Sequence, residues 1–158
     1  MSARTTLIVG LGNPILGDDG VGWRVAEEVG RRLTDAATPV EVDCVSLGGL
    51  SLMERLIGYD CAILIDAVRT GHGPIGAVSR FALGDLPDQS AGHLSAAHDT
   101  SLQTALQVGR AMGARLPARI TIVGVEAYNI YEFSEELSPP VAAAVPRAAD
   151  LVLESLAE

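Results

Sequence analysis

Three short runs of uninterrupted apolar residues constrain the fold of this chain more than any other feature. They are TLIVG at residues 6–10, CAILI at residues 61–65 and ITIVGV at residues 120–125. Continuous apolar strands are typical of a sheet covered on both faces, whereas a strand with one wet face alternates apolar and polar residues. The sequence therefore predicts a mostly parallel sheet with helices on both sides.

The remaining segments supply the other layers of such a fold. Residues 40–45 alternate and predict a more exposed edge strand, and residues 77–83 predict a further strand. Apolar residues recur at one-turn spacing in 21–33 and 102–112, which predicts helices there, and a short helix is expected at 50–57. A last helix is expected to begin at Pro139, after an N-cap at Ser138. Because the chain has no repeat or linker, we predict one three-layer α/β domain over residues 1–158, with a twisted, mostly parallel sheet of about five strands.

Charge and composition exclude several classes of partner. The formal net charge is −9 and the arginines are scattered, so we expect no nucleic-acid partner. The first apolar run is too short for a signal peptide or membrane span, which predicts a cytoplasmic protein without a membrane partner. Cys44 and Cys61 fall in predicted buried strands and are expected to be free thiols. No large apolar surface segment demands a second copy, and we expect a monomer.

A glycine-rich turn follows the first strand, with the sequence GLGNPILGDDGVG at residues 10–22. A dinucleotide fingerprint would need glycine where Ile15 stands, and two aspartates at the start of the next helix would repel a pyrophosphate. We expect Asp18 to be the N-cap of that helix. Asp19 would then occupy its first position as a metal ligand or an electrostatic anchor.

Two further residues are expected near Asp19. Asp66 ends an apolar strand, and open α/β sheets place their sites at the carboxyl ends of such strands. A strand-end aspartate also commonly bonds the backbone of the following loop, so this structural role stays open. His98 precedes the helix predicted at 102–112 and could reach the same edge; His93 competes for the role, and His72 is expected to be a loop residue.

Two carboxylates and one imidazole form a three-ligand set with open positions. Catalytic and substrate-binding metal sites have this form, whereas structural sites are closed. Nitrogen and oxygen donors without a thiolate fit zinc, nickel or a similar ion. Asp19, Asp66 and His98 are therefore a hypothesis for a metal site that spacing alone does not establish.

The sequence resembles the nickel–iron hydrogenase maturation proteases, also called hydrogenase maturation endopeptidases. The residues that carry the resemblance are the motif at 10–22, Leu-Ile-Asp-Ala at 64–67, Ser-Ala-Ala-His at 95–98, Ile-Val-Gly-Val at 122–125 and Leu-Ser-Pro at 137–139. They keep the family's order and spacing over nearly the whole chain. Position 19, which is glutamate in some members, is aspartate here.

The resemblance implies a fold of the phosphorylase/hydrolase-like type and an endopeptidase. Its substrate would be the precursor of a hydrogenase large subunit, from which it removes a C-terminal peptide after nickel insertion. Asp19, Asp66 and His98 would contact the nickel and serve catalysis. The substrate would present this nickel, and none is expected to stay tightly bound to the isolated protein.

Two long segments without periodicity, 84–97 and 126–137, are expected to be functional loops. The second is rich in acids and aromatics, and it is either a solvated lid or the receptor of a basic residue beside the scissile bond.

Three alternative functions remain at this stage. The opening LIVGLGNP at residues 7–14 also resembles peptidyl-tRNA hydrolase, but the catalytic histidine that follows it in that family is absent here. A nickel-binding chaperone or adaptor could use the same three residues without catalysis, and a catalytically dead paralogue is a third reading. Serine or cysteine protease chemistry is disfavoured, because there is no G-x-S-x-G motif and neither cysteine lies in a predicted loop.

Overall fold

A computed structural model describes residues 3–33, 39–85 and 101–158. These residues form a five-stranded sheet with the strand order β2-β1-β3-β5-β4. The strands are β1 (Thr6–Leu11), β2 (Val40–Val45), β3 (Cys61–Val68), β4 (Val78–Ala82) and β5 (Arg119–Glu126). The α-helices are α1 (Val21–Arg32), α2 (Gly49–Leu56), α3 (Leu102–Ala111) and α4 (Pro139–Leu156), and short 3-10 helices span η1 (Gly17–Gly20) and η2 (Leu83–Asp85).

The sheet is parallel except at one edge. β1 pairs in parallel with β2 and β3, and β3 pairs in parallel with β5, whereas β4 runs antiparallel to β5. This confirms the prediction of a mostly parallel sheet of about five strands and places the alternating segment 40–45 at an edge. It also settles the direction of β4, which sequence patterning leaves open.

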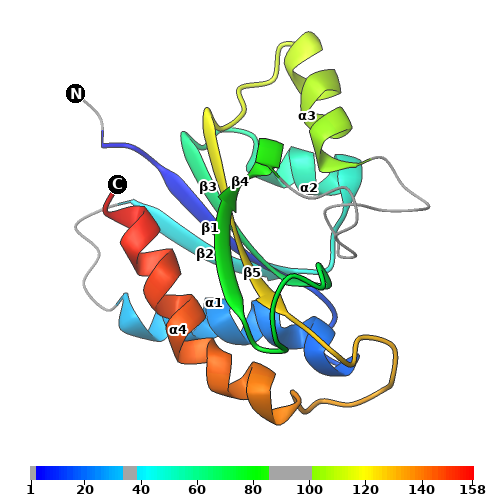
Figure 1. The fold of residues 1–158 in the computed structure, drawn as a ribbon. Coiled ribbons are helices and arrows are strands. Elements are labelled where there is room, and N and C mark those ends of the chain that lie inside the picture. The colour runs from blue at the N-terminus through cyan, green and yellow to red at the C-terminus, as the bar shows by residue number, and fades with distance from the viewer. Residues whose placement is uncertain (1–2, 34–38, 86–100) are drawn as a thin grey trace.

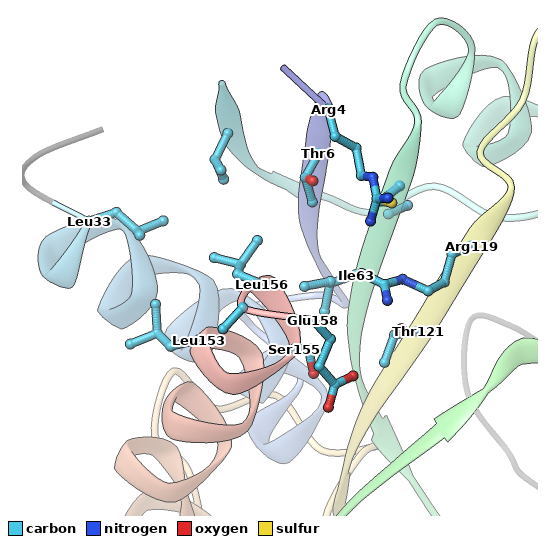
Figure 2. A pocket seen from close by; sticks show the side chains of 14 residues that line it. Arg4, Thr6, Leu33, Ile63, Arg119, Thr121, Leu153, Ser155, Leu156 and Glu158 are labelled. Carbon is cyan, nitrogen blue, oxygen red and sulfur yellow. The ribbon is translucent and has the colours of Figure 1, made fainter. Parts of the chain in front are cut away.

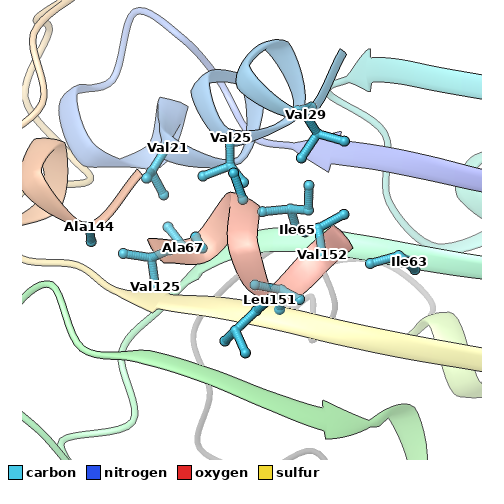
Figure 3. Close-up of a cluster of buried hydrophobic side chains, with 14 of the residues drawn as sticks. Val21, Val25, Val29, Ile63, Ile65, Ala67, Val125, Ala144, Leu151 and Val152 are labelled. Atoms are coloured by element: carbon cyan, nitrogen blue, oxygen red, sulfur yellow. The ribbon is translucent and has the colours of Figure 1, made fainter. Parts of the chain in front are cut away.

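Helices lie on both faces of the sheet (Figure 1), and a cluster of buried apolar side chains fills each interface between helices and sheet. Ile8, Ile63 and Ile65 belong to the cluster that α1 and α4 cover. Figure 3 shows Val25 of α1 and Val152 of α4 beside Ile65. Alternate residues of the same strands turn to the other face, where Leu52, Leu64 and Leu106 belong to the layer that α2 and α3 complete. β1 and β3 are buried along their whole length because helices lie on both sides. Burying each such Leu or Ile side chain stabilises the fold by about 1.5–3 kcal/mol.

The order of the strands places a topological switch point between β1 and β3. From β1 the chain passes through α1 to β2 on one side of β1, and then through α2 to β3 on the other side. The loops that leave the carboxyl ends of β1 and β3 therefore diverge, and open α/β sheets bind ligands at such a switch point. Both Asp19 and Asp66 belong to this end of the sheet.

Candidate active site

Glycines let the first turn of α1 sit directly on the ends of β1 and β3. An ideal Cβ on Gly22 would lie 2.3 Å from the carbonyl oxygen of Leu11 and 2.5 Å from that of Ile65. A Cβ on Gly12 would lie 1.9 Å from the carbonyl oxygen of Asp19, and Gly12 has a φ of +137° that other residues rarely adopt. The glycines of the motif thus bring the segment carrying Asp19 against β1 and the start of α1 against the residue before Asp66.

Asp19 lies in η1 with 7% of its surface exposed. Its Oδ2 accepts a hydrogen bond of 2.8 Å from the backbone N–H of Asn13. The Asn13 side chain accepts one of 3.1 Å from the N–H of Ile15, which holds the turn in shape. Asn13 therefore orients the Asp19 carboxylate, a role that the sequence analysis missed although Asn13 stands inside the quoted motif.

Asp66 is fully buried in β3, where it pairs with Gly124 of β5. The prediction that the strand ends at Asp66 is wrong, because β3 continues to Val68. By strand alternation the Asp66 side chain points to the same face as Leu64, the face covered by α2 and α3. On that face α3 begins at Leu102, and its N-cap Ser101 accepts a hydrogen bond from the N–H of Thr104.

His98 and its competitor His93 lie outside the described residues, as do residues 86–97 of the first predicted loop. His72 is an exposed loop residue, as expected. Within residues 3–33, 39–85 and 101–158 no three His, Cys, Asp or Glu side chains are grouped as a metal would require. The structure thus brings Asp19 and Asp66 to one edge of the sheet, and the contribution of His98 stays a prediction.

Asp18 is not the helix N-cap that the sequence suggests. The α-helix begins at Val21 rather than at Asp18, and its N-cap Gly20 makes no side-chain capping bond. Asp18 is fully buried, and its carboxylate accepts hydrogen bonds from the backbone N–H groups of Tyr128, Asn129 and Ser138 and from the Ser138 hydroxyl. Burial raises the pKa of Asp18, but the bonds from Ser138, Asn129 and Tyr128 outweigh it and hold the pKa below 3.8. Asp18 is therefore an ionised tether for the loop at residues 127–138.

Glu126 has a comparable structural role on the neighbouring loop. It ends β5 with only 4% of its surface exposed, so it does not belong to a solvated lid as the sequence allowed. Its carboxylate accepts hydrogen bonds from the N–H and hydroxyl of Thr70 and from the N–H of Gly71. Asp18, Asp19, Asp66 and Glu126 are the buried acids of the described chain, and all four lie at the carboxyl edge. The contacts of Asp18 and Glu126 show that both of these acids attach loops to the edge of the sheet.

The two cysteines are free thiols, as predicted, and neither is a plausible nucleophile. Cys61 is buried at the start of β3, away from the carboxyl edge. Burial, with the negative charges of Glu27 and Asp43, raises the pKa of the Cys44 thiol to about 11. A nucleophilic cysteine needs the opposite shift, because the thiolate is the reactive form.

This pKa predicts a slow reaction of native Cys44 with iodoacetamide. At pH 8 a thiol of pKa about 11 is about 0.1% thiolate, against roughly a quarter for an ordinary cysteine. Alkylation followed by mass spectrometry should therefore be far slower in the folded protein than in urea, and treatment should leave proteolytic activity unchanged. Rapid native alkylation that abolishes activity would instead indicate a thiol mechanism.

A cavity of about 450 Å³ lies at the opposite end of the sheet (Figure 2). Thr6, Cys61 and Arg119 line it, and these are the first residues of β1, β3 and β5. Asp66 is five residues further along β3 than Cys61, a distance of roughly 16 Å at about 3.3 Å per residue. This cavity is therefore separate from the edge that carries Asp19 and Asp66.

Comparison with known proteins identifies the family of this chain. Residues 8–155 match the family model of the hydrogenase maturation proteases. The chain belongs to the hydrogenase maturation protease family. The chain is also 30% identical to the hydrogenase expression/formation protein HoxM of Azotobacter vinelandii, over 100% of this chain and 75% of HoxM. HupD of Bradyrhizobium diazoefficiens is 29% identical over 96% of this chain and 78% of its own length.

Solved structures of hydrogenase maturation proteases share the fold. A hydrogenase 2 maturation peptidase from a Thaumarchaeota archaeon is 29% identical, with a TM-score of 0.69 over 98% of this chain and 99% of its own. The hydrogenase maturating endopeptidase HybD of Escherichia coli gives a TM-score of 0.74 over 97% and 92% of the two chains, and at 24% identity it supports the fold alone.

The family match confirms the resemblance read from the sequence and makes this chain a protease. It also sets aside the peptidyl-tRNA hydrolase alternative. None of the helices in the described ranges is long and apolar enough to cross a bilayer.

Proposed function

We propose that this protease removes the C-terminal peptide of a nickel–iron hydrogenase large-subunit precursor after nickel has been inserted. The observation that supports it most is the burial of Asp19 and Asp66 at the switch-point edge of a hydrogenase maturation protease fold. We further propose that Asp19, Asp66 and His98 contact the nickel that the precursor carries. We expect the protein to act as a cytoplasmic monomer.

The donors at this edge fit a borderline metal ion that arrives with the substrate. Carboxylate oxygens and an imidazole nitrogen bind nickel and zinc, and three protein ligands leave coordination positions for the substrate. The hydrogen bond from the Asn13 N–H fixes the orientation of the Asp19 carboxylate, as hydrogen bonds to metal ligands commonly do. Because the metal belongs to the substrate, the isolated protein needs no resident ion.

Hydrolysis at this edge needs a base and a route for one proton. Water adds to the carbonyl carbon of the scissile bond, the C–N bond breaks, and the water's proton passes to the amine that leaves. A carboxylate of Asp19 or Asp66 is suited to accept and return that proton, provided it lies within hydrogen-bond reach of the water. A nearby metal ion can supply Lewis-acid polarisation of the carbonyl or the water.

The test is cleavage of a purified large-subunit precursor with and without inserted nickel, followed by intact-mass analysis. We expect shortening only of the nickel-loaded precursor, and loss of that shortening with Asp19→Ala. Cleavage that is independent of nickel would contradict the recognition step. Stoichiometric nickel binding by the protein itself, without any cleavage, would favour the adaptor instead.

A further inference from the structure

The loop between β5 and α4, residues 127–138, is firmly attached to the segment that carries Asp19. Asp18 binds both ends of the loop, through the N–H groups of Tyr128 at 3.1 Å and of Ser138 at 2.7 Å. The middle is attached as well, because Ser134 accepts a bond from the N–H of Gly17 at 2.8 Å and donates one to the carbonyl of Ile15 at 2.9 Å. Hydrogen bonds therefore hold both ends and the middle of the loop in place.

All three aromatic side chains of this loop are exposed to solvent. Tyr128, Tyr131 and Phe133 are 71%, 73% and 84% exposed, and Ile15 on the adjoining segment is 46% exposed. The whole chain has six aromatic residues, one Trp, three Tyr and two Phe, so half of them lie on this loop. Single exposed apolar residues are ordinary, but a group of aromatics on an ordered loop is typical of a protein-binding surface.

The charges and position of the loop indicate what it would contact. Glu132, Glu135 and Glu136 accompany the aromatics, while Arg69, just beyond β3, stacks on the ring of Tyr131 at 5.7 Å. In Figure 1 the loop projects from the carboxyl end of β5, the end at which Asp66 lies. A partner held there would need an apolar recess with a basic rim, and it would reach the edge where cleavage is proposed.

We propose that residues 127–138 are the docking surface for the folded body of the precursor, and that Asp18 is the positioning residue that holds this surface beside Asp19. Tyr128, Tyr131 and Phe133 insert into an apolar recess of the precursor, and the three glutamates face its basic rim. This inference rests on the proposed function for the identity of the partner. It explains why Asp18, which is fully buried, binds the loop although it stands next to Asp19, the acid proposed for chemistry.

Phe133→Ser and Tyr131→Ser test the docking surface, with Met112→Ser as the matched control. Met112 is equally apolar and 82% exposed, but it follows α3 and lies outside the loop. We expect each loop variant to raise KM for the nickel-loaded precursor, and the Kd for binding it, tenfold or more, with kcat changed less than twofold. The Met112 variant should match the wild type.

Asp18→Asn tests the positioning role. The substitution removes the negative charge that accepts four hydrogen bonds from the loop, so the loop should be held less firmly. We therefore expect faster cleavage by a glutamate-specific protease within residues 132–136 and a KM raised at least tenfold. A role in stability alone would lower Tm without changing KM of the folded enzyme. Ser138→Ala removes only the 2.8 Å hydroxyl bond to Asp18 and should give an intermediate KM.

The outcomes separate this inference from the proposed function. An unchanged KM and Kd in both loop variants, with normal cleavage by the wild type, would overturn the docking surface and leave the protease assignment intact. If the wild type fails to cleave the precursor but binds it, and the loop variants lose that binding, the docking surface stands and the proposed function fails. No binding by the wild type would overturn both.

Discussion

Asp66→Asn is expected to lower kcat/KM for precursor cleavage about 10²- to 10³-fold, the range seen when one preorganised electrostatic group is removed from an active site. Asparagine has the same shape as aspartate but no charge, so it can neither hold a metal ion well nor accept the water's proton. The fold should survive, because a neutral amide costs less to bury than a carboxylate in the fully buried position of Asp66. Cleavage kinetics by intact mass and a thermal melt measure the two effects separately.

Asp60→Asn is the control for this prediction. Asp60 stands immediately before β3, at the other end of the same strand, where it binds the N–H and hydroxyl of Thr5 at 2.8 and 3.0 Å. Its loss should leave kcat/KM unchanged, since it lies at the amino edge. His98→Gln should resemble Asp66→Asn, because His98 is the proposed third contact. Wild-type kinetics in Asp66→Asn would place the active site elsewhere.

Gly22→Ala is expected to destabilise the protein by about 3–5 kcal/mol or to prevent folding, which is the upper range for a single substitution. The added Cβ would lie 2.3 Å from the Leu11 carbonyl oxygen and 2.5 Å from that of Ile65. Both neighbours are backbone atoms of central strands, which cannot move aside as a side chain could. α1 would have to lift from the sheet, and Asp19 would move with it. Urea unfolding followed by circular dichroism measures the change in free energy.

Gly30→Ala in the same helix is the matched control. Apart from its chain neighbours and the backbone of its own helix, no heavy atom lies within 4 Å of a Cβ built on Gly30, which is exposed near the end of α1. Alanine there should stabilise the protein by about 0.5–1 kcal/mol, because it restricts the unfolded chain and favours the helix. Equal stability changes at the two positions would show that helix propensity, rather than the close approach of backbones, explains the need for glycine at position 22.

Much of the fold is predictable from local patterns in this sequence. The runs 6–10, 61–65 and 120–125 correspond to β1, β3 and β5, and no end differs by more than three residues. They are predictable because a strand covered on both faces is apolar along its whole length. This pattern can be recognised in the sequence without knowing which strands lie beside it. The predicted helix at 50–57 appears as α2, from Gly49 to Leu56. It is predictable because its buried apolar residues recur about once per helical turn.

The roles of the acids were less accessible to local reasoning. Asp18 looks like an N-cap, because it precedes a helix and aspartate favours that position. Its actual partners, Tyr128 and Ser138, are more than a hundred positions away in the chain. Local pattern likewise places Glu126 in a loop, since nothing near it in the sequence indicates that its carboxylate binds Thr70.

The sequence by itself determined the layers, the parallel core, the glycine motif and the position of Asp19 and Asp66 at one end of the sheet, because each follows from the spacing of a short segment. Only the tertiary structure decided the strand order, the antiparallel direction of β4 and the attachment of two loops by the buried acids Asp18 and Glu126. The physical reason is that a carboxylate's role depends on which N–H groups reach it, and in this chain most of them come from distant segments. Local patterns specify which residues are buried, whereas long-range hydrogen bonds specify what the buried charges do.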